Sequence, residues 1–162
     1  VNAIKALRAY HLSLAHSERL LSAKLATMDF SMQQHLFSSL KDAGYHIGII
    51  TNDSDSSTAL FLSLMGLQQY IDFVASRESH YKRKPHPQAF FEFCTRFSLT
   101  PCQVAMVGDT LTDMLFARKA GAGYRIGVLS GSNDARRLER HSDIVYPNIS
   151  ALLDDNRLFS SN

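Results

Sequence analysis

Two aspartates that follow a short apolar run are the residues of this chain whose types and spacing point most clearly to chemistry. Residues 104–107 (Val-Ala-Met-Val) run into Gly108 and Asp109, and Asp113 follows four positions later. The run predicts a buried strand, and the helical pattern from Thr110 onward places both carboxylates on one side of a helix start. Ligands of open α/β sheets bind at the carboxyl ends of the strands. Two carboxylates suit a hard cation, so we expect Asp109 and Asp113 to hold Mg²⁺.

A second polar group, residues 51–53 (Thr-Asn-Asp), follows the apolar run 47–50. A hydroxyl and free backbone N–H groups at a helix start can hold a phosphate. Helix capping is the simpler interpretation of these residues taken alone. A calcium-binding loop is excluded, because Thr58 stands where such a loop needs glycine and Leu64 where it needs glutamate.

A third group, residues 82–87 (Lys-Arg-Lys-Pro-His-Pro), puts three cations beside a proline-stiffened turn. Such cations could neutralise a phosphate, and an ordinary solvated basic loop explains them equally well. No aromatic platform or extended basic stripe accompanies them, which argues against nucleic-acid binding. A plain nucleotide-binding domain is also disfavoured, because the chain has neither a Gly-x-Gly-x-x-Gly nor a Walker-type lysine loop.

The composition is that of a globular domain. The chain has 162 residues, of which 45% are hydrophobic and 20% charged, and its net charge of +2 argues for neither nucleic acid nor membrane. No apolar run approaches the ~20 residues that a membrane span needs. Two cysteines, Cys94 and Cys102, give no disulfide framework, and Cys94 lies on the apolar face of an expected helix. These features predict a cytoplasmic protein.

Apolar periodicity predicts alternating strands and helices. Strands are expected at residues 47–51, 73–75, 104–107, 124–128 and 144–146. Helices are expected at residues 3–26, 31–43, 88–97, 111–120 and 133–140, with one more ending at Met65 and a last helical turn at 149–154. This alternation predicts an α/β fold: a three-layer, Rossmann-like parallel sheet with right-handed crossovers. The first helix stands apart, because no strand precedes it.

In order and spacing the three polar groups resemble motifs of the haloacid dehalogenase superfamily of phosphotransferases, closest to its phosphoglycolate-phosphatase-like branch. The resemblance covers about residues 28–155. It implies that Thr51, with Asn52, orients the phosphoryl group. It further implies that Lys84 stabilises a phosphoaspartyl intermediate and that Asp109 and Asp113 bind the Mg²⁺ cofactor.

The resemblance also implies a domain division and a gap. Residues 1–27 resemble the C-terminal part of a helical cap, and residues 28–162 resemble a core domain without its first strand. The family's nucleophile and acid form an Asp-x-Asp motif, and none precedes Thr51. Asp29 follows Leu-Ala-Thr-Met rather than a convincing strand, and Ser31 stands in the second acid's place, so we do not expect Asp29 to be the nucleophile.

The expected function is therefore a Mg²⁺-dependent phosphatase that acts on a small phosphorylated metabolite through an aspartyl-phosphate. We expect the isolated chain to be inactive, because the nucleophile segment is absent. The alternative is a non-catalytic remnant or anion-binding module that retains the fold. The resemblance implies that the absent strand lies between the strands that end at Thr51 and Asp109. Either these strands pair directly, or another copy of the chain or a missing N-terminal segment fills the place, which makes a homo-oligomer one of the expected states.

Overall fold

The structure, a computed structural model, describes residues 3–5, 28–130 and 135–159 of the chain. Its strands form two three-stranded sheets in which every pair is parallel. The first sheet has the order β1-β2-β3, built from Ala3–Lys5, His46–Ile50 and Phe73–Ala75. The second has the order β4-β5-β6, built from Ala105–Gly108, Tyr124–Val128 and Ile144–Tyr146.

Helices connect the strands where the sequence carries capping and stop residues. Ser54 accepts a hydrogen bond from the Ser57 backbone N–H at the start of one helix, and Gly121 ends another in the left-handed conformation. The helices are α2 (Ser31–Asp42), α3 (Asp55–Leu64), α4 (Gln88–Arg96), α5 (Leu111–Ala120), α6 (Ala135–His141) and α7 (Asn156–Phe159). Shorter 3₁₀ turns are η1 (Gln68–Tyr70), η2 (Pro101–Gln103) and η3 (Ile149–Asp154). Among the described residues, no helix combines the length and apolar character of a membrane span.

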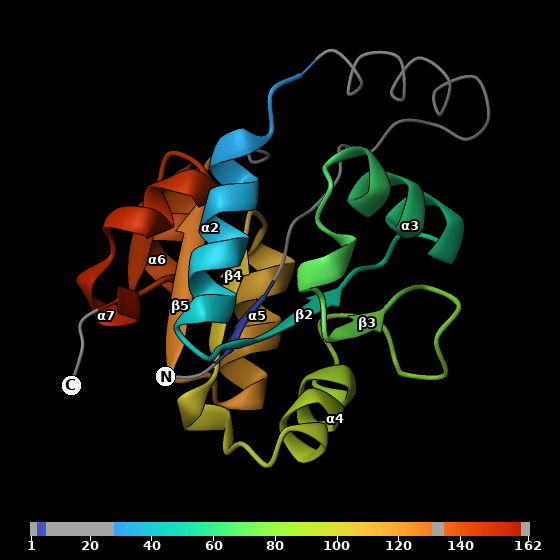
Figure 1. Cartoon of the computed structure of the whole chain (residues 1–162). Helices are drawn as coiled ribbons and strands as arrows, with labels where there is room; N and C mark the ends of the chain where they lie inside the picture. Colours follow the sequence, from blue (N-terminus) through green and yellow to red (C-terminus); the bar gives the residue numbers. More distant parts are fainter. Residues whose placement is uncertain (1–2, 6–27, 131–134, 160–162) are drawn as a thin grey trace.

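Strand β1 lies between β2 and β4 (Figure 1). It pairs with β2 in the register Ala3 opposite His46 to Lys5 opposite Gly48. It contacts β4, but within the described part of both segments no hydrogen-bonded ladder joins the two, so the layer is interrupted there. The prediction of a helix that begins at residue 3 is therefore wrong for Ala3–Lys5, because pairing with the edge of β2 overrides the local helical pattern. Residues 6–26 of that prediction lie outside the described residues.

The position of β1 also decides one of the alternatives for the absent strand. Within the described residues β2 pairs with β1 and β3, and β4 pairs with β5, so β2 and β4 do not pair directly. Exchange with another copy and an accompanying upstream segment stay predictions. The cap assignment of residues 1–27 stays one too, although Ala3–Lys5 lie in the sheet.

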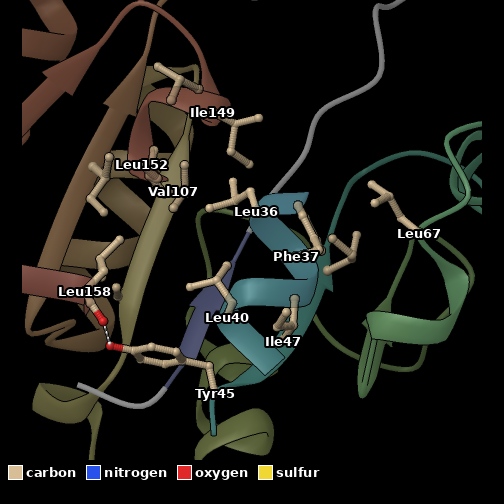
Figure 2. Packing of buried hydrophobic residues seen from close by; sticks show 14 of the residues in the cluster. Leu36, Phe37, Leu40, Tyr45, Ile47, Leu67, Val107, Ile149, Leu152 and Leu158 are labelled. Carbon is tan, nitrogen blue, oxygen red and sulfur yellow. Dashed lines mark hydrogen bonds between the residues drawn. The ribbon is translucent and has the colours of Figure 1, made fainter. Parts of the chain in front are cut away.

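Two hydrophobic clusters cover the two faces of the strands. On one face, Leu36, Phe37 and Leu40 of α2 pack with residues of both sheets, including Ile47 and Val107 (Figure 2). The other cluster also joins both sheets, and its members include Ile50, Phe73, Phe90, Met106 and Phe116. Because each cluster spans the interruption, the six strands act as one layer between two helical layers, and the predicted three-layer α/β fold is confirmed.

Candidate active site

Strand β4 delivers two carboxylates to its carboxyl end. All four of its residues are buried, and Asp109, which follows at once, is 7% exposed. Thr110 then caps α5, because its hydroxyl accepts from the Asp113 backbone N–H at 3.3 Å. The Asp113 carboxylate returns the contact and accepts from the Thr110 hydroxyl at 2.7 Å and from its N–H at 3.2 Å. This reciprocal capping holds the Asp113 side chain against the end of β4.

Gly108 is what allows that side chain to lie there. A Cβ added at Gly108 would stand 2.3 Å from the Cβ of Asp113 and 2.8 Å from its Cγ. Non-bonded carbon atoms do not approach each other this closely, so any larger residue at position 108 would displace Asp113. The glycine is therefore needed for the close approach of Asp113.

Lys84 reaches the same carboxylate from the loop between β3 and α4. Its Nζ lies 2.6 Å from Asp113 Oδ1, and the two side chains are only 7% and 3% exposed. The neighbouring cations Lys82 and Arg83 are exposed, so Lys84 is the one that turns inward from this loop. A buried ion pair persists only when geometry and further hydrogen bonds compensate the loss of hydration, and Thr110 supplies such bonds to Asp113.

Thr51 occupies the corresponding position at the end of β2. It is buried, and its backbone N–H donates to the carbonyl of Ala75 at 2.8 Å. Its hydroxyl donates to Asp53 Oδ2 at 2.8 Å and accepts from the Asp53 N–H at 3.1 Å. Asn52 is half-buried, and its side-chain oxygen has no hydrogen-bond partner within the described part of the chain. The Thr51 hydroxyl is thus held within its own loop.

The predicted site residues therefore fall into two parts along one edge of the sheet. Lys84 and Asp113 are in contact, and Asp109 lies beside them at the end of β4. Thr51 and Asn52 follow β2, which β1 separates from β4. One hydrogen-bonded strand spacing of ~4.8 Å and the unpaired contact between β1 and β4 therefore separate the two parts. Carboxyl ends of parallel strands share one edge, so both parts face the same side.

The donor chemistry of this edge fits a magnesium ion. Among the described residues no three His, Cys, Asp or Glu side chains converge as a metal cluster. Mg²⁺ does not require one, because it keeps several waters and is usually bound through one or two carboxylates plus substrate phosphate. Asp113 is bonded to Lys84 and Thr110, and Asp109 provides the second carboxylate at the end of β4.

Two further aspartates are placed by the structure. Asp29 is exposed ahead of α2, where Oδ1 accepts from the Ser31 N–H at 2.8 Å. That backbone hydrogen bond lowers the pKa of Asp29, and the residue lies at a helix start rather than at a strand end. Asp53 is a residue that sequence reasoning missed as a partner of Thr51. The signal was the spacing of two, at which an acid and a hydroxyl close a short polar turn.

Comparison with known proteins gives a family match over most of the chain. The model of the haloacid dehalogenase-like hydrolases matches residues 14–126. The phosphoglycolate phosphatase of Nitrosospira multiformis is 32% identical over 111 residues, which is 68% of this chain and 48% of that protein. That of Thiobacillus denitrificans is 34% identical over 110 residues, covering 67% of this chain and 48% of that protein. The chain spans about half the length of these relatives.

Solved structures agree on the fold. The crystal structure of a predicted phosphoglycolate phosphatase from Haemophilus somnus superposes with a TM-score of 0.72 at 21% identity, over 87% of this chain and 64% of that one. A hydrolase from Pseudomonas syringae gives a TM-score of 0.70 at 23% identity, over 93% of this chain and 76% of that one. At these identities the likeness concerns the arrangement of the elements.

Proposed function

Because the chain belongs to the haloacid dehalogenase-like hydrolase family, we propose that it carries part of the site of a Mg²⁺-dependent phosphatase acting on a small phosphorylated metabolite. The observation that supports this most is the buried contact between Lys84 and Asp113 at the end of β4. It places a cation and carboxylates at one strand end, which is the combination that phosphoryl groups and Mg²⁺ need together.

Each residue has a separate task in this proposal. Asp109 and Asp113 hold Mg²⁺, and the ion, when bound, neutralises charge on the phosphoryl oxygens. Lys84 adds a second positive charge at the same place. Thr51 and Asn52 orient the phosphoryl group through the hydroxyl and the side-chain amide. The similarity of this chain to relatives that are named phosphoglycolate phosphatases supports a small substrate.

The proposed chemistry proceeds through an aspartyl-phosphate, and this sequence has no Asp-x-Asp ahead of Thr51. A carboxylate nucleophile forms the covalent intermediate and a neighbouring acid protonates the leaving alkoxide. Neither group is assigned to a residue of this chain. We therefore propose that the chain, by itself, binds phosphate together with Mg²⁺ but turns over phosphomonoesters negligibly.

Calorimetric titration of inorganic phosphate tests the binding site. In the presence of MgCl₂ we expect weak binding that is lost without the metal and lost in Asp109→Asn. Asp42→Asn is the matched control, because it removes the same charge from the exposed end of α2. Binding that needs neither Mg²⁺ nor Asp109 would favour a non-catalytic anion-binding module instead.

A turnover assay tests the second half of the proposal. The chain is expected to release no p-nitrophenol from p-nitrophenyl phosphate above the Mg²⁺-only background. Steady Mg²⁺-dependent turnover that Asp109→Ala abolishes would contradict the proposed inactivity, and it would require a nucleophile within these 162 residues.

A further inference from the structure

Two of the three residues that the proposed function assigns to the phosphate are held by carboxylates of the chain itself. Lys84 is bound to Asp113, and the Thr51 hydroxyl is bound to Asp53. Asp113 has a structural reason for its position, since it also completes the cap of α5. Asp53 has no such role in α3, because Ser54 caps that helix. The Asp53 carboxylate therefore acts on Thr51 rather than on the helix that follows.

We propose that Asp53 opposes the binding of phosphate at Thr51 and thereby lowers the affinity of the site for phosphate. The inference rests on the proposed function, because it concerns the same phosphate site. A hydroxyl has one hydrogen to donate, and Thr51 gives it to Asp53 Oδ2 at 2.8 Å. The backbone N–H of Asp53 occupies an acceptor lone pair of the same oxygen. An anion can bind to Thr51 only after the Asp53 carboxylate has released that hydrogen.

Charge acts in the same direction as the hydrogen bond. A phosphate oxygen bound to the Thr51 hydroxyl would lie within a few ångströms of the Asp53 carboxylate, and like charges at that distance repel measurably even when water screens them. Asp53, Asp109 and Asp113 carry three negative charges against one positive charge on Lys84, a formal sum of −2 for these four side chains. Phosphate is therefore expected to bind after a divalent cation. The charge of Asp53 increases the dependence of phosphate binding on that cation.

The surroundings of Asp53 favour this contact with Thr51. Thr51 and Asp53 both line a small hollow between β2 and α3, and its wall is mostly apolar, with Ile49, Phe61 and Leu62. The Thr58 hydroxyl on that wall already donates to the Ser54 carbonyl at 2.8 Å. The hollow therefore offers the Asp53 carboxylate few donors in place of the Thr51 hydroxyl.

The test is a phosphate titration of the whole chain in MgCl₂ with charge-neutral variants. Asp53→Asn keeps the shape and an acceptor for Thr51 but removes the charge, and we expect it to bind phosphate about tenfold more tightly, the effect of ~1.4 kcal/mol. Asp53→Ser serves as a second variant with the same expected direction. Asp55→Asn is the control: it removes an equal charge two residues later, where the carboxylate bonds to Ser76, and its affinity should stay within about twofold of the parent.

The outcomes separate the inference from the proposed function. Unchanged or weaker binding in both Asp53 variants, or an equal gain in Asp55→Asn, overturns the role of Asp53 while the phosphate site stands. A gain that persists when Thr51→Val is added to Asp53→Asn also overturns it, because the hydroxyl would then be irrelevant. If the parent and every variant fail to bind phosphate with MgCl₂ present, the proposed function falls and the inference falls with it.

Discussion

Lys84 and Asp113 form a buried ion pair, with 2.6 Å between Nζ and Oδ1, that joins the loop before α4 to the first turn of α5. The same carboxylate is hydrogen-bonded to Thr110 and lies against Gly108. One side chain thus ties together a loop, a strand end and a helix start. The stability of this edge of the sheet should depend on it more than on any exposed charge nearby.

Removal of the lysine should leave Asp113 as an uncompensated buried charge. We expect Lys84→Met to lower the free energy of unfolding by about 3–5 kcal/mol, measured by urea denaturation. Addition of Asp113→Asn to Lys84→Met should recover part of this loss, because the buried charge is then gone. Lys82→Met is the control, since that lysine is exposed in the same loop, and it should change stability by less than ~0.5 kcal/mol. Equal effects of the two lysine variants would show that the pair is not buried in solution.

Glycine at position 108 should be required for steric reasons alone. Gly108→Ala would place a Cβ 2.3 Å from that of Asp113, and we expect a loss of about 3 kcal/mol or more. Gly44→Ala is the matched comparison, because a Cβ there meets nothing within 4 Å and only the positive φ of 82° is strained. That variant should lose about 1–2 kcal/mol. A smaller loss at Gly108 than at Gly44 in thermal unfolding would contradict the packing.

The two cysteines should react at very different rates. Burial raises the pKa of Cys94 to about 11, so its thiolate is scarce at neutral pH, whereas Cys102 is exposed. With Ellman's reagent at pH 8 the folded chain should release one equivalent of thionitrobenzoate quickly and the second only after denaturation. Cys102→Ser should abolish the fast phase. Retention of the fast phase in that variant would show that Cys94 is accessible.

The ion pair between Arg125 and Asp143 should contribute to stability only above acidic pH. The Arg125 side chain donates to Asp143 and lowers the pKa of that carboxyl below its unfolded value of about 4. A lowered folded pKa means that the contribution is present above pH ~4 and is lost as the pH falls through the folded pKa. Both side chains are 31% exposed, so the gain is at most about 1 kcal/mol. Asp143→Asn should lose this amount at pH 7 and match the parent near pH ~2, with Asp42→Asn as the control.

The sequence predicted the elements that carry strong local signals. The strands at 73–75, 124–128 and 144–146 and the helix at 111–120 have the predicted bounds, because short apolar runs between turn residues leave little freedom. α7 was missed, because four residues at Asn156–Phe159 give no periodicity to detect. β1 was missed for a different reason, since its strand conformation depends on the edge of β2, which lies more than forty positions away.

For the site, the sequence located the residues but not how they are engaged. Spacing and residue type were enough to select Lys84, Asp109 and Asp113, and the structure brings the first and last of these into contact. The roles of all the selected residues in binding remain predictions. The hydrogen bond from Thr51 to Asp53 could not be deduced, because a short polar turn and a phosphate-binding turn have the same sequence pattern.

The interruption between β1 and β4 also bears on the size of what this edge can hold. Thr51 stands on one side of that seam and Asp109 on the other, and hydrogen bonds do not fix the seam's width as they fix the spacing within each sheet. The distance between the two halves of the site therefore depends on β1 and on the two hydrophobic clusters that span the interruption. A bulkier or slimmer strand in the place of β1 would act as a spacer and would change the span of the ligand that both sides can reach together.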